Sequence, residues 1–475
     1  MTSNPHRWRI LAVVATAFFM TILDVSIVNV ALPSIAKDLH FSRDNLQWVI
    51  TAYAITFGGF LLLGGRAADL LGRRRVFLVG VVIFTTASLV CGLAQSEGML
   101  IASRAVQGFG GAIISPAALS IVTTTFEEGA DRNKALGVWG ALGGSGAAVG
   151  VLLGGVLTDY LSWRWIFFVN VPVGALVLLV TTSIVPESRV EGEKRHYDAL
   201  GAVLVSSGLA LLVYAISEAP NVGWGTARTI LLLIGAGALL VAFLVNERRV
   251  SDPLMPFHIF QVRTVAGANA VGFLLGAVIF ANFFLLTLYV QGVLHYSPLK
   301  AGLTFLATAG TAVLAAGVAQ ALTTRFGAKP IIVIGLVLLT IAMVWYSRIP
   351  VDGKFVSDLL PGYLLVGVGI AFAFVPVSIA ALAGVSNREA GLASGLINTS
   401  QQIGGAIGTA VASTVFATHY KTLLREGRSI PDALTHGYGY AFWALAFFGF
   451  AAIVAALTLI RREEMAQSTA TAPIA

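Results

Sequence analysis

The chain has 475 residues, of which 57% are hydrophobic and 11% are charged, and its mean hydropathy is +0.85. Soluble domains carry about 25% charged residues, so this composition excludes a soluble globular protein and indicates a polytopic helical membrane protein. The net charge of +7 does not indicate nucleic-acid binding, because the basic residues lie in short stretches between apolar runs and report membrane topology. The single cysteine, Cys91, excludes an intrachain disulfide and suggests no metal cluster.

Apolar segments long enough to cross a bilayer as helices follow one another along the whole chain. The first begins with Arg7 and Arg9, as a signal peptide would, but it is too long for one and contains Asp24. We therefore expect it to be retained as a membrane span. The fourteen predicted segments run approximately 9–33, 46–65, 76–94, 99–123, 134–158, 164–186, 198–217, 227–246, 264–290, 300–323, 330–347, 358–384, 391–417 and 438–460.

Lysine and arginine are distributed unequally over the connections between these segments. An even number of spans places both termini on one face, and that face collects nineteen basic residues against ten on the other. This excess predicts that both termini are cytoplasmic. We expect a multi-pass protein of a bacterial-type inner membrane, surrounded by the lipid bilayer, with its function among the helices because the connections are short.

The seventh and eighth segments divide the remaining twelve into two sets of six. Neither of the two carries an acid or a base in mid-span, which suits a linking or lipid-facing role. The sequence therefore predicts an all-α membrane protein of 14 transmembrane helices. We expect an N-terminal six-helix bundle over residues 1–190, two additional linking helices over 191–260, and a C-terminal six-helix bundle with a short cytoplasmic tail over 261–475.

The second half of the chain weakly repeats the first. Residues 320–330 keep only part of the basic, glycine-containing pattern of the stretch 64–75, in Arg325, Gly327 and Lys329. Residues 391–408 are rich in glycine like residues 137–155. Two related halves are typical of rocking transporters, whose binding site lies at the midplane between them.

Asp24 is the one acid that the predicted spans place near mid-membrane. An acid at that depth is a candidate functional residue, because a buried carboxylate costs several kcal/mol unless it is paired or hydrated. Thr21, Ser26 and Asn29 surround it with polar groups, and Pro33 follows. A proton-exchange site is the functional interpretation; a helix–helix hydrogen bond or a structural ion pair is the alternative.

Arg104 lies a few residues inside the fourth predicted span. Since a guanidinium does not lose its proton, it needs a carboxylate, carbonyl groups or water nearby. Gln107 and Gly108 continue its face of the helix one turn on. The alternative is that Arg104 extends to the nearby outer interface. Pairing with Asp24 is a hypothesis at this point.

The stretch GGRAADLLGRRR, residues 64–75, holds three glycines, one acid and four arginines between two apolar segments. A loop so rich in charge and glycine is suited to hold helix ends together. In the fifth span, Gly146, Gly150 and Gly154 recur at every fourth position and form a smooth face for close helix packing.

Polar and aromatic residues within the spans are candidates for a substrate cavity, although most such residues in membrane proteins pack in cores or at interfaces. No P-loop, HExxH, GxSxG or metal-spaced Cys/His set occurs, so we expect neither an enzyme nor an ATP-driven pump, and no cofactor or metal. The cavity candidates are Asn29, Tyr53, Gln107, Asn282, Phe283, Phe372 and Asn398.

Together these motifs resemble the major facilitator superfamily and, within it, the fourteen-span drug:proton antiporters. The resemblance covers the chain from about residue 8 to 460, and SWRWIFFVNVPVG, residues 162–174, is similar to the same branch. Two positions depart from the family pattern: Leu70 replaces an arginine of the loop motif, and Val151 replaces the proline of the fifth-span motif. The matching residues are Gly65, Asp69, Gly72, Arg73, Arg74 and Arg75 in the loop; Asp24, Asn29 and Pro33 in the first span; Arg104, Gln107 and Gly108 in the fourth; and Gly137, Gly146, Gly150, Gly154 and Gly155 in the fifth.

The resemblance implies a monomer that exports small hydrophobic, often cationic, drug-like compounds in exchange for protons, driven by the proton gradient. Asp24 and Arg104 would carry proton coupling. The loop 64–75, with Asp69, would latch the cytoplasmic ends of the two halves. The alternatives are a proton-coupled transporter of one metabolite, lipid or siderophore, and a non-transporting sensor, which the short C-terminal tail disfavours.

Overall fold

The computed structural model is helical, and no strand occurs in the part of the chain that it describes. That part comprises residues 6–42, 45–126, 130–188, 198–251, 253–255, 257–381 and 390–460. Its helices are α1 (Arg7–Asp38), α2 (Trp48–Leu71), α3 (Arg73–Gly92), α4 (Glu97–Thr125), α5 (Ala130–Tyr160), α6 (Trp165–Phe168), α7 (Asn170–Ile184), α8 (Ala199–Val222), α9 (Ala227–Arg249), η1 (Phe257–Gln261), α10 (Arg263–Gly292), α11 (Pro298–Phe326), α12 (Ala328–Tyr346), η2 (Phe355–Leu359), α13 (Leu360–Ala381), α14 (Ala390–Arg425) and α15 (Ile430–Leu459).

Among the described residues, eleven helices are long and apolar enough to cross a membrane. Two shorter apolar stretches, Trp48–Leu61 and Val149–Tyr160, lie within α2 and α5. The prediction of an all-α, multi-pass membrane protein is confirmed, whereas the number fourteen stays a prediction. Helices suit this environment because they satisfy their backbone hydrogen bonds internally.

Side chains fix several helix ends. The Ser96 hydroxyl accepts a hydrogen bond from the backbone N–H of Met99 at 3.3 Å and caps α4, with Glu97 in the first turn. Ser429 caps α15 in the same way through the N–H of Asp432. Such caps supply partners for N–H groups that a helix start leaves unpaired.

The chain folds into two compact units. Unit 1 comprises residues Met1–Ser206, Arg249–Leu254 and Ser297–Leu303. Unit 2 comprises residues Ser207–Arg248, Met255–Tyr296 and Thr304–Ala475.

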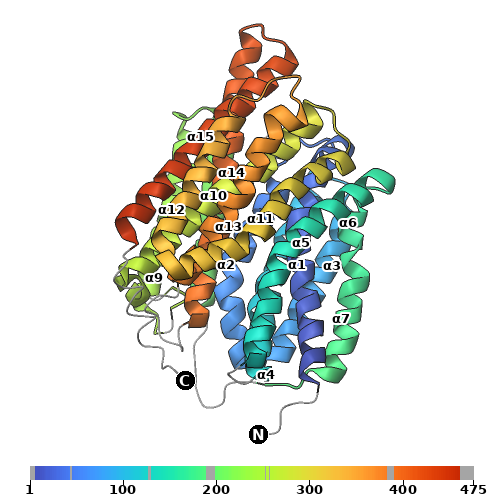
Figure 1. Ribbon diagram of the computed structural model, residues 1–475, viewed down its shortest axis with the longest axis vertical. Helices are drawn as coiled ribbons and strands as arrows, with labels where there is room; N and C mark the ends of the chain where they lie inside the picture. Colours follow the sequence, from blue (N-terminus) through green and yellow to red (C-terminus); the bar gives the residue numbers. More distant parts are fainter. Residues whose placement is uncertain are drawn as a thin grey trace. The chain divides into compact units, whose positions relative to one another are not determined.

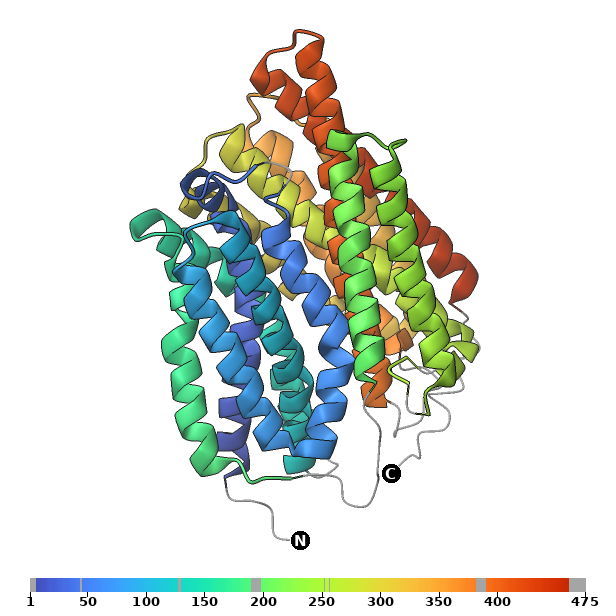
Figure 2. The same cartoon turned by 180° about the vertical axis from the view of Figure 1, so that it is seen from behind.

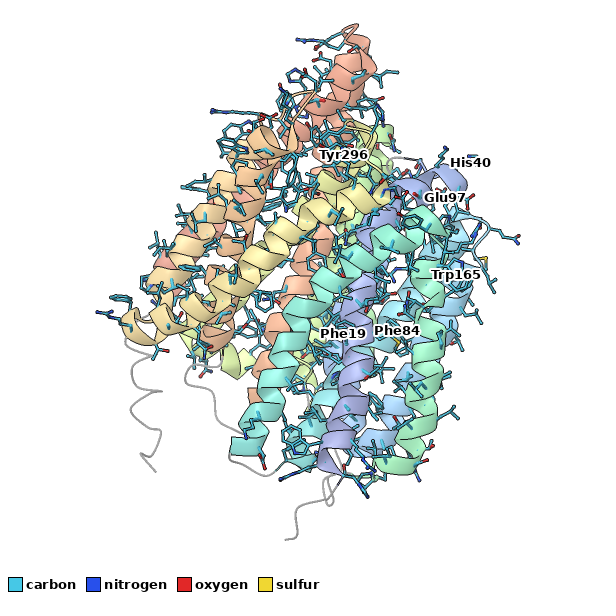
Figure 3. All side chains as sticks on the ribbon, turned by 45° about the vertical axis from the view of Figure 1, so that its right-hand side comes forward. Phe19, His40, Phe84, Glu97, Trp165 and Tyr296 are labelled. Carbon is cyan, nitrogen blue, oxygen red and sulfur yellow. The ribbon has the colours of Figure 1, made fainter. Side chains whose placement is uncertain are left out.

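In unit 1, α4 packs along α2 and α3, while α1 packs along α5 and also meets α4 and α7. Helices α1, α3, α5 and α7 run side by side on one side of the unit (Figure 1). Phe77 and Phe84 of α3 and Ile114 of α4 are fully buried inside this unit. Figure 3 shows Phe84 inside this unit, and Glu97, His40 and Trp165 together at one of its ends.

In unit 2, α10 packs along α14 and α15, and α12 packs along α13 and α15. Helices α8 and α9 lie side by side (Figure 2), and Leu240 of α9 covers Gly208 of α8. The Thr414 hydroxyl of α14 donates to the carbonyl of Ile216 at 3.1 Å, which ties α8 to the long α14.

Internal features of the two units agree with a repeated architecture. Gly72 separates α2 from α3 with φ +106°, and Gly327 separates α11 from α12 with φ +84°. Both angles lie in the left-handed region, which glycine adopts without steric cost. Glycines also line the contact of α5 with α1 and that of α14 with α10, where Gly404 and Gly408 meet the backbone of Phe273 and Ala277.

Candidate functional site

Asp24 is completely buried in unit 1, and its carboxylate accepts hydrogen bonds from three side chains. Its Oδ2 lies 2.5 Å from Nη1 of Arg104. Its Oδ1 accepts from Nε2 of Gln107 at 2.7 Å and from Nδ2 of Asn170 at 3.0 Å. The buried carboxylate of Asp24 thus has an opposite charge and two amide donors as partners. The cluster carries no net charge, and these contacts offset the cost of burying the carboxylate.

Arg104 turns inward and is 1% exposed, so it does not extend to an interface. Its Nε donates to the carbonyl of Val49 at 2.9 Å, and its Nη1 also donates to Oε1 of Gln107 at 2.6 Å. The guanidinium lies over the ring of Tyr53, 4.4 Å from its centroid, and 5.7 Å from that of Phe167. Carbonyl, carboxylate and aromatic contacts together meet the needs of a buried guanidinium.

A second layer of polar groups continues from Asn170 away from Asp24. Nδ2 of Asn170 donates to Oγ of Ser88 as well as to Asp24, at 3.0 Å in both cases. The Ser88 hydroxyl in turn donates to the carbonyl of Phe167 at 2.9 Å. Hydrogen bonds therefore link α1 to α7, α7 to α3, and α3 to α6.

Cys91 is also part of this region. Its buried thiol lies 3.2 Å from Oγ of Ser103 and 3.5 Å from Oε1 of Gln107. Sequence reasoning identified Asp24, Arg104 and Gln107 but gave no role to Asn170, Ser88 or Cys91. The segment 162–174 was the available signal for Asn170; nothing in the sequence distinguishes Ser88 from other serines in apolar helices.

The opposite face of α1 packs against the glycines of α5, which fixes the rotation of Asp24. A Cβ on Gly150 would lie 2.9 Å from the carbonyl of Leu23, and one on Gly154 would lie 2.7 Å from that of Ile27. The Ser26 hydroxyl donates to the carbonyl of Gly146 at 3.3 Å. The glycine face predicted from the sequence thus contacts α1 directly behind Asp24.

Gly155 of the same helix meets a different neighbour within unit 1. A Cβ there would lie 2.8 Å from Cα of Leu299, and one on Gly302 would lie 2.8 Å from the carbonyl of Val151. The glycines of α5 therefore allow two close contacts, with α1 and with the start of α11.

The residues of the loop motif lie at the junction of α2 and α3. Gly65 of α2 faces Pro116 of α4, 3.4 Å from the position of a Cβ. At the start of α3, the carboxylate of Glu187 accepts hydrogen bonds from the backbone N–H groups of Arg74 and Arg75, both at 3.1 Å. An anion at a helix N-terminus is favourable because it pairs with free N–H groups and the helix dipole.

Other backbone contacts complete this junction. The N–H of Arg73 donates to the carbonyl of Ser188 at 2.9 Å, and Nη1 of Arg74 donates to the carbonyl of Val185 at 3.2 Å. The chain that follows α7 is therefore attached to the start of α3. The side chain of Asp69 lies outside the described residues, so its role as a latch stays a prediction.

The predicted cavity residues are distributed over both units. Tyr53 and Gln107 belong to the Asp24 cluster, with exposures of 2% and 0%, and Nδ2 of Asn29 donates to the carbonyl of Val25 within α1. In unit 2, Asn282 is 2% exposed, and no hydrogen bond is present at its Oδ1. Phe283 of α10, Phe372 of α13 and Asn398 of α14 also belong to unit 2. Among the described residues, no group of His, Cys, Asp or Glu has the geometry of a metal site.

Residues 14–409 match the family model of the Major Facilitator Superfamily. The chain belongs to this family. It is therefore a transporter-family membrane protein and not an enzyme, as the sequence predicted. The chain is 40% identical over 479 residues to the puromycin resistance protein pur8 of Streptomyces alboniger, covering 99% of this chain and 95% of that protein. It is 39% identical to the cephamycin export protein CmcT of Amycolatopsis lactamdurans, covering 94% of this chain and 90% of that one.

Solved structures of other transporters share the fold of this chain. A bacterial homolog of the human lysosomal transporter Spinster, inward-facing and unoccupied, matches with a TM-score of 0.68 at 16% identity and covers 98% of this chain and 99% of its own. An auto-inhibited peptide transporter of the POT family matches with a TM-score of 0.69 at 13% identity and covers 98% of both chains. At such identities the likeness concerns the fold alone.

Proposed function

We propose that this chain exports hydrophobic, often cationic, antibiotic-like compounds in exchange for protons. Relatives of 33% to 40% identity are named for resistance to or export of puromycin, cephamycin and tetracenomycin C, and each covers at least 90% of this chain. A further relative, 35% identical over 431 residues, is named multidrug resistance protein Stp, which favours a multidrug rather than a single-substrate exporter.

The proposal includes the finer architecture and topology. Fourteen spans form two six-helix bundles, residues 1–190 and 261–475, with residues 191–260 as a linking pair. Both termini lie in the cytoplasm, and the protein acts as a monomer in the inner membrane. The proton gradient drives alternating access without a cofactor.

The observation that carries the proposal is the buried ion pair of Asp24 and Arg104. With Asp24 ionised the pair is neutral, and neither charge reaches solvent. Protonation of Asp24 leaves the guanidinium uncompensated, and an unpaired buried charge costs several kcal/mol. The closed cluster therefore suits ionised Asp24, whereas protonated Asp24 favours an arrangement in which Arg104 reaches water.

Such a difference in stability between two arrangements is what coupling requires. In an outward-open state, Asp24 takes a proton and the substrate leaves. In an inward-open state, Asp24 loses the proton to the cytoplasm and the site again favours the substrate. A cationic compound also binds less well next to an uncompensated guanidinium, so proton and drug exclude each other.

The test is transport of puromycin and ethidium by purified protein in proteoliposomes under an imposed pH gradient. We expect Asp24→Asn to abolish gradient-driven transport, because position 24 no longer exchanges a proton. The double variant Asp24→Asn with Arg104→Gln removes both charges and is the second test should the single variant fail to fold. Asp159→Asn, at an exposed position in the last turn of α5, is the matched control and should transport normally.

Undiminished gradient-driven transport by either Asp24 variant would overturn the role of Asp24. Transport of only one compound from a panel of unrelated lipophilic drugs would instead favour a specific exporter of a metabolite, lipid or siderophore.

A further inference from the structure

Asn170 lies between the carboxylate of Asp24 and the hydroxyl of Ser88, and all three side chains are at most 1% exposed. Because an ionised carboxylate only accepts hydrogen bonds, the amide must present Nδ2 to Asp24. The same Nδ2 serves Ser88. The orientation of the Asn170 amide is therefore fixed by the charge of Asp24.

Protonation of Asp24 gives its carboxyl group a hydrogen to donate, whereas the ionised carboxylate only accepts hydrogen bonds. The proton goes to Oδ1, because Oδ2 lies against the guanidinium of Arg104 at 2.5 Å. The new O–H requires an acceptor, but both partners of Oδ1, Gln107 and Asn170, present N–H groups to it. One of the two amides must then turn to offer its oxygen.

Gln107 is not free to turn. Its Oε1 accepts from Nη1 of Arg104 at 2.6 Å, and a guanidinium only donates. If the amide of Gln107 turned over, its Nε2 would face Nη1 of Arg104, and two donors would lie together beside a positive charge. Asn170 differs because its other neighbour is the hydroxyl of Ser88, which can both donate and accept.

We propose that Asn170 is a positioning residue whose side-chain amide turns over when Asp24 is protonated and thereby transmits the charge of Asp24 through Ser88 to the Phe167 carbonyl. In the turned state, Oδ1 of Asn170 accepts from the O–H of Asp24 and from the Ser88 hydroxyl. The hydrogen of Ser88 then leaves the carbonyl of Phe167, to which it now donates. The inference rests on the proposed role of Asp24 in proton exchange.

The hydrogen bond that is lost in this step connects two helices. Ser88 belongs to α3 and Phe167 to α6, so protonation on α1 weakens the contact of α3 with α6. The segment that carries Phe167 and Asn170 also holds the far end of α1, since Nε1 of Trp163 and Nη2 of Arg164 both lie 2.9 Å from Oδ2 of Asp38. A shift of this segment therefore affects α1 both at Asp24 and at Asp38.

The other charged or titratable groups around Asp24 are few. Arg104 comes from α4, Tyr53 from α2 and Cys91 from α3. The residues of α5 that meet α1 here are Gly146 and Gly150, and α7 contains no titratable residue. The hydrogen bonds of the Gln107 and Asn170 amides, rather than a second ion pair, therefore respond to the protonation state of Asp24.

The experiment is a pH titration of Asp24 in the reconstituted full-length protein, followed by the infrared carbonyl band that Asp24→Asn removes. We expect Asn170→Ala to raise the midpoint by roughly one pH unit, because the hydrogen bond lost by the ionised carboxylate is stronger than the neutral one lost by the protonated form. Ser88→Ala should raise it less, because it removes the acceptor of the second N–H of Asn170 Nδ2 and leaves the hydrogen bond to Asp24 in place.

Thr86→Ala is the matched control, since Thr86 lies on α3 and donates only to carbonyls of its own helix. It should leave the midpoint unchanged. Asn170→Ser, which keeps a small polar group, replaces Asn170→Ala if the alanine variant does not fold and should raise the midpoint by a smaller amount. Identical midpoints in wild type and in the Asn170 variants would overturn the proposal. A raised midpoint in Asn170→Ala with an unchanged midpoint in Ser88→Ala would also overturn it, because a fixed amide that only donates to Asp24 does not involve Ser88.

The two proposals fail separately. Gradient-driven transport by Asp24→Asn would refute the proposed function, whatever the infrared titration gives. Loss of transport in that variant, with an unchanged midpoint in Asn170→Ala, would refute only the role of Asn170.

Discussion

Asp24 and Arg104 neutralise each other in the interior of unit 1, where Coulomb attraction is strong and desolvation of both ions is costly. Val49 and Gln107 accept hydrogen bonds from Arg104, and Gln107 and Asn170 donate to Asp24. Such a pair adds little net stability compared with two neutral residues, but loss of one partner is costly. A gain in net stability therefore does not by itself account for the two charges at this position.

This asymmetry predicts the behaviour of a double-mutant cycle. Arg104→Gln leaves the carboxylate of Asp24 buried without a cation, which should destabilise the protein by about 3–5 kcal/mol. Adding Asp24→Asn removes the second charge, so the double variant should melt closer to wild type than Arg104→Gln does. Thermal unfolding in detergent measures the apparent melting temperatures of wild type, the two single variants and the double variant.

A double variant that melts as low as Arg104→Gln, or lower, would show that hydrogen bonding rather than charge balance dominates at this position. Transport by the same proteins gives the contrast, because restored stability should not restore proton-driven exchange.

At the scale of elements, α1 is held between two different surfaces. One face carries Asp24 towards the polar groups of α4 and α7, and the other lies on the smooth glycine face of α5. Within a bilayer, close packing of this kind is a main source of helix association. The glycines therefore determine how far Asp24 lies from Arg104, although they touch neither side chain.

Gly150→Ala should displace α1 and impair both stability and transport. The added Cβ would meet the Leu23 carbonyl at 2.9 Å, and backbone cannot move aside as a side chain can. We expect a destabilisation of about 1–3 kcal/mol, which is typical of overpacking. The measurement is thermal unfolding together with drug transport in proteoliposomes.

Gly237→Ala on α9 is the matched control, because a Cβ at that position has no atom within 4 Å. Alanine favours the helix over glycine by up to about 1 kcal/mol, so this variant should be neutral or more stable. Equal melting temperatures for the two alanine variants would contradict the close contact of α5 with α1.

At the scale of the whole molecule, the alternation of the predicted spans agrees with the course of two helices inside unit 2. Nζ of Lys329 at the start of α12 donates to the carbonyl of Leu457 near the end of α15, at 2.7 Å. At the other ends of these helices, a Cβ on Gly439 would lie 2.7 Å from the carbonyl of Ser347. The two helices are therefore antiparallel, as spans that alternate in direction require.

Single cysteines test which ends face the cytoplasm. Thr324→Cys, exposed near the end of α11, should react with a membrane-impermeant maleimide only after the cells are permeabilised. Glu426→Cys, exposed after α14, should react in intact cells. The native Cys91 stays in place because it is fully buried. The opposite labelling pattern would reverse the proposed orientation.

The sequence alone determined the membrane class, the two candidate charged residues within the spans, Asp24 and Arg104, and the glycine face. Each depends on residue type and local spacing: apolar runs of span length, rare charges within them, and glycines at every fourth position. The connection at Gly72 is shorter than the loop predicted over residues 64–75, because α2 continues to Leu71 and α3 begins at Arg73. The number of spans and the functional roles of these residues stay predictions.

Only the tertiary structure decided which side chains meet. Arg104 and Asp24 are 80 residues apart, and their pairing depends on the rotation of α1 and α4 about their axes. Asn170, Ser88 and Glu187 acquire partners from other helices: Asp24 for Asn170, Asn170 for Ser88, and the start of α3 for Glu187. The sequence shows which side chains need a partner in a membrane, because the cost of desolvation depends on residue type. Tertiary packing determines which partner each of them has.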